Sequence, residues 1–186
     1  MNSILQPYRP AGTMTASQPG DEAVPTAPPL RIRTAERADC ATILEFIVAL
    51  AEYEKLRHEV TATVADLERT LFGEQPGAEV VIAEWRGEAA GFALFFSSYS
   101  TFLARPGIYL EDLFVHPHLR GHGIGLSLLR HLARLAVERG CGRLDWSVLT
   151  WNEPAIRFYE RIGARAMRDW TQYRLDGERL RALAAA

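Results

Sequence analysis

The chain has 186 residues, of which 48% are hydrophobic and 24% charged, a composition typical of a globular protein with one domain. Lysine and arginine total 21 against 23 acidic residues, and this formal charge of −2 argues against a general nucleic-acid binder and against a polybasic membrane anchor. The two cysteines, Cys40 and Cys141, are far apart and lack CxxC spacing, which argues against a disulfide scaffold or a zinc ribbon.

Residues 1–29 contain six of the ten prolines and few large apolar residues. Such a segment buries too little apolar surface to offset the entropy lost on ordering, so we expect a disordered leader before a domain over 30–186. Met1 and Met14 are both compatible with translation start. There is neither an apolar run of about 18 residues nor a signal-peptide pattern, so we expect a cytoplasmic protein without a membrane partner.

The first half of the domain shows strand and helix periodicities in turn. Alternation over 30–33 predicts a strand, and apolar residues at helical spacing predict a helix over 37–57 with Asp39 as its N-cap. A second helix is expected over 63–72.

Three further strands follow. Residues 80–85 and 89–99 are expected to form a hairpin. We expect Pro106 and Gly107 to break the chain before a fourth strand over 108–115.

The second half alternates helix and strand. We expect a long amphipathic helix over 122–139, a fifth strand over 144–149, a helix over 153–162, a last strand near 166–175 and a short helix over 177–184. This order predicts an α/β fold built around one central sheet.

The most informative segment is the glycine-rich turn from Arg120 to Gly125, which joins the fourth strand to the long helix. Alternate glycines leave the amides at a helix N-terminus open to an anion such as a diphosphate, with Arg120 adding positive charge. A helix start with packing glycines would also fit. A P-loop is excluded because no lysine follows these glycines, and a dinucleotide fingerprint is excluded because the third glycine is replaced by Leu126 or Leu128.

The remaining pattern, RxxGxG after a strand, resembles the acetyl-CoA loop of the GNAT acetyltransferase superfamily. Together with YLED at 109–112 and NEPA at 152–155, it resembles the spermidine/spermine-type diamine acetyltransferase branch over about residues 31–180. The resemblance implies a GNAT-like mixed central sheet with helices on both faces, and a homodimer.

The resemblance also implies acetyl-CoA as co-substrate. It would be held by the end of the fourth strand, the glycine loop and the segment after Trp151, namely by Leu113, Phe114, Val115, Arg120, Gly121, His122, Gly123, Ile124, Gly125, Leu126, Asn152, Glu153, Pro154 and Ala155. Asn152 would also suit a simple helix cap, and the two roles are compatible.

Two carboxylates, Glu111 and Asp112, interrupt an apolar strand, where unpaired charges are costly. Strand alternation points them to opposite faces, so only one is expected to face a given cleft. An edge position or a salt bridge would explain them structurally. By resemblance, Glu111 is a general base acting through water, and Asp112 positions the substrate or the loop.

On its own, Tyr159 would fit the packing face of an amphipathic helix, but its position after NEPA matches the family's catalytic tyrosine. A phenol with a pKa near 10 stays protonated and can give its proton to the departing CoA thiolate. By resemblance, the substrate-binding residues are Tyr53, Glu54, Glu111, Asp112, Asp145, Trp146 and Ser147. Tyr53 and Glu54 would otherwise be a solvated helix end.

We expect no metal site. His116 and His118 have no clustered carboxylate or cysteine beside them, and Cys141 has no histidine at catalytic spacing, so loop and packing roles fit them better.

The expected function is acetyl-CoA-dependent N-acetylation of a small-molecule primary amine, either a short diamine, a polyamine or a lysine analogue such as thialysine. The alternatives are a protein or peptide N-acetyltransferase and a non-catalytic acyl-CoA-binding module. Polyamine-acetylating members tend to carry an acidic Asp-Pro-Trp stretch where this chain has Ser100, Thr101 and Phe102. We therefore expect a small amine to be preferred over spermine.

Overall fold

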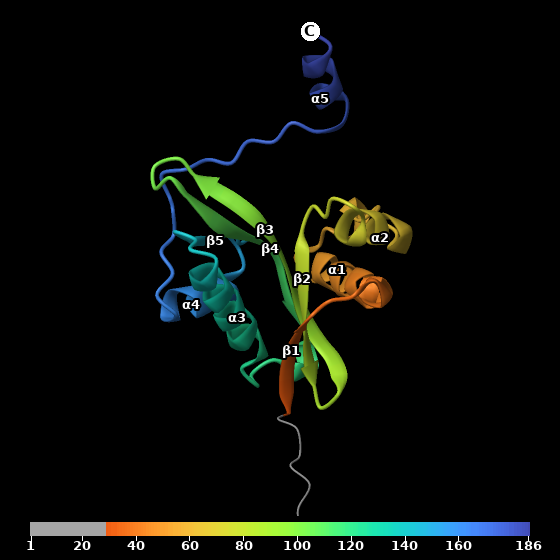
Figure 1. Ribbon diagram of the computed structural model, residues 1–186, viewed down its shortest axis with the longest axis vertical. Helices are drawn as coiled ribbons and strands as arrows, with labels where there is room; N and C mark the ends of the chain where they lie inside the picture. Colours follow the sequence, from red (N-terminus) through yellow and green to blue (C-terminus); the bar gives the residue numbers. More distant parts are fainter. Residues whose placement is uncertain (1–28) are drawn as a thin grey trace, which may run out of the picture.

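The computed structural model describes residues 29–186, which are built around one five-stranded sheet (Figure 1). The expected leader therefore lies, except for Pro29, outside the described residues. The strands follow the order β1-β2-β3-β4-β5, and their bounds are β1 Leu30–Thr34, β2 Glu79–Trp85, β3 Glu88–Ser100, β4 Arg105–Val115 and β5 Leu144–Trp146. The first four strands are antiparallel, whereas β5 runs parallel to β4.

Helices cover both faces of this sheet. In Figure 1, α1 (Cys40–Glu54) and α2 (Val64–Phe72) lie on one side, and α3 (Ile124–Glu138) and α4 (Glu153–Arg161) lie on the other. The last helix, α5 (Gly177–Ala184), lies apart at the end of an extended segment. The expected mixed α/β sheet with helices on both faces is confirmed.

Each face of the sheet has its own apolar core, and β2 contributes to both. Val80 and Ile82 pack toward α1 and α2, while Val81 and Ala83 pack toward α3. Side chains alternate along a strand, so a continuous apolar run such as this one fits a strand that is buried on both faces.

Local signals account for several helix ends. Thr63 caps α2 through a reciprocal capping box with Asp66. Asp39 does precede α1, but its side chain makes no cap hydrogen bond to that helix. Its carboxylate instead accepts hydrogen bonds from Arg33 (2.7 Å) and from the Glu36 amide (2.7 Å), which ties β1 to the start of α1.

The expected break at Pro106 and Gly107 is wrong, because both residues lie inside β4. Ile108 donates its N–H to the carbonyl of Arg143 (3.1 Å), toward the β5 edge. Pro106 lies two residues earlier, so its nitrogen faces the same edge of β4. Because β5 has not yet begun at this point, no strand-to-strand hydrogen bond requires the N–H that proline lacks.

The strand expected over 166–175 is absent, and the fifth strand ends at Trp146 rather than at 149. The segment after α4 is irregular, with Trp170 72% exposed and Tyr173 92% exposed. A strand needs a partner, and β5 offers only a three-residue edge. Within 29–186, every helix is too short or too polar to cross a membrane.

Candidate active site

A cavity of ≈ 1450 Å³ opens where β4 and β5 separate. The two strands pair only between 108–110 and 144–146, whereas β4 continues to Val115. The edge of β4 over 111–115 therefore has no β5 partner, and its main-chain groups border the cavity. An unpaired strand edge of this kind can hydrogen-bond an extended ligand.

A β-bulge in β4 places two carboxylates at this cavity. Leu110 pairs with Phe95 and Asp112 with Leu94, so Glu111 is an extra residue without a β3 partner. We expected Glu111 and Asp112 on opposite faces, but the bulge interrupts the strict alternation and both border the same cavity.

Three carboxylates that border the cavity, Glu54, Glu111 and Asp112, lie close enough to influence one another. Burial, together with the nearby charges of Glu111 and Glu54, raises the pKa of Asp112 to about 6. Burial also raises the pKa of Glu54, which borders the cavity from the last turn of α1. Carboxylates that repel one another and are poorly solvated favour an incoming ammonium group.

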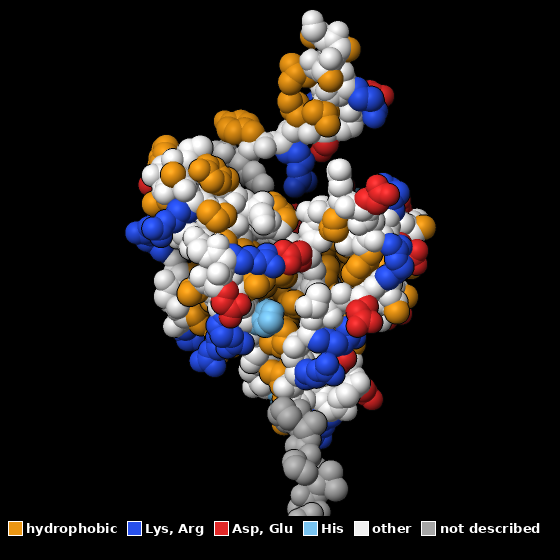
Figure 2. All heavy atoms as spheres, in the orientation of Figure 1, with side chains coloured by type: hydrophobic (Ala, Val, Ile, Leu, Met, Phe, Trp, Pro, Cys, Tyr) orange, Lys and Arg blue, Asp and Glu red, His pale blue; other side chains and the backbone are white. Residues whose placement is uncertain are grey.

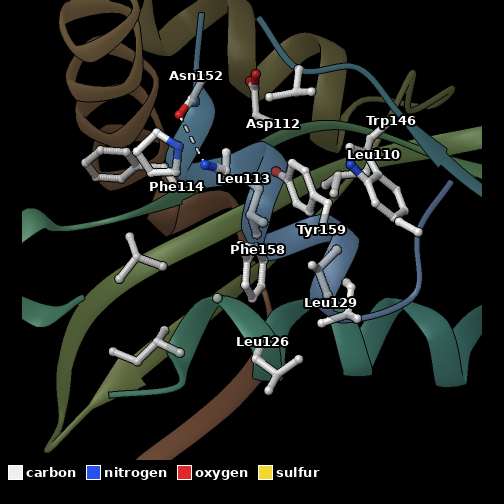
Figure 3. A pocket seen from close by; sticks show the side chains of 18 of the residues that line it. Leu110, Asp112, Leu113, Phe114, Leu126, Leu129, Trp146, Asn152, Phe158 and Tyr159 are labelled. Carbon is white, nitrogen blue, oxygen red and sulfur yellow. Dashed lines mark hydrogen bonds between the residues drawn. The ribbon is translucent and has the colours of Figure 1, made fainter. Parts of the chain in front are cut away.

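Tyr159 enters the cavity from α4. Its ring lies 5.1 Å from that of Trp146 and 5.4 Å from that of Phe158, and Figure 3 shows Tyr159, Trp146 and Asp112 around one cavity although they come from α4, β5 and β4. Burial raises the pKa of Tyr159, and the charge of Glu54 adds to the effect. The phenol therefore keeps its proton at neutral pH.

The glycine loop forms the end of the cavity next to α3. Gly121 (φ 85°) and Gly123 (φ 79°) are left-handed, and a Cβ added to either would meet no atom within 4 Å. Gly123 is the N-cap of α3 and has no side chain, so the first amides of this helix receive no side-chain cap and remain available to a ligand. Arg120 lies beside them and donates from Nε to the Val115 carbonyl (3.1 Å). Open amides, a helix N-terminus and an arginine together fit a diphosphate.

Most predicted site residues border this cavity. They are Tyr53, Glu54, Glu111, Asp112, Leu113, Phe114, Val115, Arg120, Gly121, Gly123, Ile124, Gly125, Leu126, Trp146, Ser147, Asn152, Pro154, Ala155 and Tyr159. Glu153 and Asp145 do not border it, and instead form ion pairs with Arg157 (3.3 Å) and Arg143 (2.6 Å). His122 is also outside, where its ring packs against an aromatic residue of β2.

The structure adds residues that the sequence did not single out. Phe158 of α4 and Leu129 of α3 line the cavity, and Arg161 and Arg130 border it from the same two helices. Gln172 reaches it from the segment after α4. An amphipathic helix was expected over 122–139, but nothing in the sequence indicates which of its side chains border the cavity.

Residues 41–164 match the acetyltransferase (GNAT) family. The chain is 37% identical over 165 residues to thialysine N-epsilon-acetyltransferase of Mus musculus, covering 83% of this chain and 96% of that protein. It is 40% identical over 126 residues to L-ornithine N5-acetyltransferase NATA1 of Arabidopsis thaliana, covering 68% of this chain and 52% of that protein.

Among solved structures, an integron cassette protein from the mobile metagenome of V. cholerae is similar, with a TM-score of 0.74 and 30% identity. The match covers 86% of this chain and all of that one.

The glycine loop can be tested by substitution. In Gly123→Val, a branched side chain would fill the open space over the amides, so CoA should bind at least tenfold more weakly in calorimetry. Gly87→Val is a matched control, because Gly87 is also left-handed (φ 88°) with open space around it but lies in the β2–β3 turn. The assignment is wrong if both variants bind CoA equally well.

The buried carboxylate makes stability depend on pH. The folded pKa of Asp112, about 6, lies above its usual 3.8, so the folded chain holds this proton more tightly and stability falls as pH rises through about 6. Asp112→Asn should therefore be more stable than wild type at pH 7.5, by up to roughly 3 kcal/mol or several degrees in Tm. The gain should vanish near pH 4.

Thermal melts at both pH values measure this difference. Glu74→Gln, at an exposed position, serves as control and should show no pH-dependent gain. An Asp112→Asn melting point that stays below wild type at pH 7.5 would contradict the costly buried charge.

Proposed function

The chain belongs to the GNAT acetyltransferase family and is an N-acetyltransferase, and we propose that it transfers the acetyl group of acetyl-CoA to a primary amine of a small molecule. One observation carries this proposal: a single cavity joins an unpaired strand edge and an open glycine loop to a group of carboxylates and a buried phenol. The first two features suit the donor, and the last two suit an amine and its chemistry.

Three features of the cavity suit acetyl-CoA as the acetyl donor. CoA has an extended arm with two amides, which can hydrogen-bond to the free edge of β4 over 111–115 as a neighbouring strand would. Its diphosphate fits the open amides over 121–126, next to Arg120. The second wall is the start of α4, where Asn152 accepts a hydrogen bond from the Ala155 amide (3.4 Å).

The acceptor must lose a proton before it can attack. An alkyl amine has a pKa near 10.4, so keeping it neutral at pH 7 costs about 4.6 kcal/mol. Glu54 and Asp112 attract the ammonium group, and Glu111, exposed at the rim, takes its proton through water.

The chemical step is a direct displacement. The amine nitrogen forms a bond to the thioester carbonyl carbon, and the carbon–sulfur bond breaks. The sulfur leaves as a thiolate, to which Tyr159 gives its proton. The acylated nitrogen then loses its second proton, which returns through water to the Tyr159 phenolate, and the proton held by Glu111 passes to solvent. The products are the N-acetylamine, free CoA thiol and one proton.

The acidic lining favours a short acceptor. Among the described residues, the acids that border the cavity are Glu54, Glu111 and Asp112. Ser100, at the position where polyamine-acetylating members tend to carry an acidic residue, is 3% exposed and does not border the cavity, and neither does Phe102, which is 92% exposed. Spermine carries several ammonium groups, and this cavity offers few partners for those far from the reacting one.

We also propose a cytoplasmic homodimer. Hydrophobic side chains gather over the end of the β3–β4 hairpin and along the segment after α4 (Figure 2). The most exposed include Tyr99, Phe102, Trp170 and Tyr173. An apolar surface of this kind is typical of a contact with another chain.

Both cysteines are free thiols, as expected in a reducing compartment.

The proposed proton donor can be tested with Tyr159→Phe, which removes only a hydroxyl. General acids contribute about 10²–10⁴-fold in rate, so turnover should fall at least tenfold while CoA affinity stays the same. Turnover is measured by thiol release, and Tyr99→Phe on the exposed hairpin is the control. Full activity in Tyr159→Phe would remove this residue from the mechanism.

The acceptor class can be tested with a panel of amines. We expect kcat/KM to be higher for thialysine and for a short diamine than for spermine or a lysine-containing peptide. A kcat/KM for spermine at least tenfold above that for thialysine and the short diamine would contradict the short-acceptor proposal. A preferred peptide would indicate a protein acetyltransferase, and CoA binding without thiol release for any amine would indicate a non-catalytic module.

A further inference from the structure

Tyr53 joins three separate elements at the mouth of the cavity. Its hydroxyl donates a hydrogen bond to Oδ1 of Asn152 (3.0 Å). The guanidinium of Arg120 lies 4.9 Å from its ring centroid, and the ring of Trp151 lies 5.9 Å away. By resemblance Tyr53 was expected to bind substrate, but in the structure its hydroxyl is engaged by the protein itself.

We propose that Tyr53 is a positioning residue that couples the binding of acetyl donor and amine, rather than a direct ligand of the amine. The inference rests on the proposed function, because it assigns the two sides of the cavity to these two substrates.

Both polar partners of Tyr53 belong to the donor side. Arg120 begins the glycine loop and is tied to the end of β4 through the Val115 carbonyl (3.1 Å). Asn152 is 8% exposed and caps α4 through the Ala155 amide. Tyr53 therefore bridges the two walls between which the donor would lie.

The next residue, Glu54, belongs to the acceptor side. It borders the cavity, and its charge raises the pKa of both Asp112 and Tyr159. Helix α1 ends at Glu54, and Lys55 takes a left-handed conformation (φ 64°) immediately after it. Because Tyr53 and Glu54 are consecutive in the last helical turn, a contact that holds Tyr53 also restrains the backbone that carries the Glu54 carboxylate.

Coupling follows from this arrangement. A donor seated on the glycine loop and the start of α4 restrains Arg120 and Asn152, and through them Tyr53 and Glu54. The amine then meets a carboxylate that is already ordered and loses less entropy on binding. Linkage is reciprocal, so the amine must strengthen donor binding by the same factor.

The experiment measures thialysine affinity by calorimetry with and without saturating CoA, which cannot react. Coupling between sites typically amounts to about 5–150-fold, and we expect at least fivefold tighter thialysine binding with CoA in wild type. Tyr53→Phe keeps the ring under Arg120 but loses the hydrogen bond to Asn152, so the ratio should fall. Tyr53→Leu loses both contacts, and the ratio should approach one.

Val137→Ala is the control at an exposed apolar residue of α3 that does not border the cavity, and it should keep the wild-type ratio. An unchanged ratio in both Tyr53 variants would overturn the proposal, even if each affinity alone had weakened. If Tyr53→Leu does not fold, the Phe variant still decides. Thialysine that binds with an intact ratio but is never acetylated overturns the proposed function alone. Thialysine acetylated with a ratio of one in wild type overturns only the coupling.

Discussion

The separation of β4 from β5 after three residue pairs is the constraint on which the rest of the site depends. A central strand normally uses both edges, and here one edge is left open over 111–115 with its other edge held by β3. Because β3 pairs with the other edge of β4, the sheet fixes the position of these open groups before an extended ligand binds. The bulge at Glu111 then brings two consecutive carboxylates to the same cavity.

The sequence predicted those parts of the molecule that local chemistry determines. The capping box at Thr63, the continuous apolar run over 80–83 and the stripe of leucines in α3 each specify an element from its own residues. The glycine loop was equally visible, because alternate glycines after a strand have few other uses. Resemblance to a family then supplied roles for Tyr159 and Glu111 that periodicity alone could not.

What the sequence missed depends on distant partners. The Tyr53–Asn152 hydrogen bond joins residues 99 positions apart, and no local pattern marks it. The bulge in β4 is a property of its register with β3, so alternation alone gave the wrong faces for Glu111 and Asp112. The apolar segment over 166–175 has strand-like composition, but a strand also needs a neighbouring edge, which β5 provides over only three residues.

The central claim is that donor and amine share one cavity. A conjugate of CoA joined through an acetyl bridge to the side-chain nitrogen of thialysine tests it most directly, with its Kd compared with that of CoA by calorimetry. We expect the conjugate to bind at least tenfold more tightly than CoA, and Asp112→Asn to lose much of this gain. Equal affinities of wild type for the conjugate and for CoA would contradict a shared cavity.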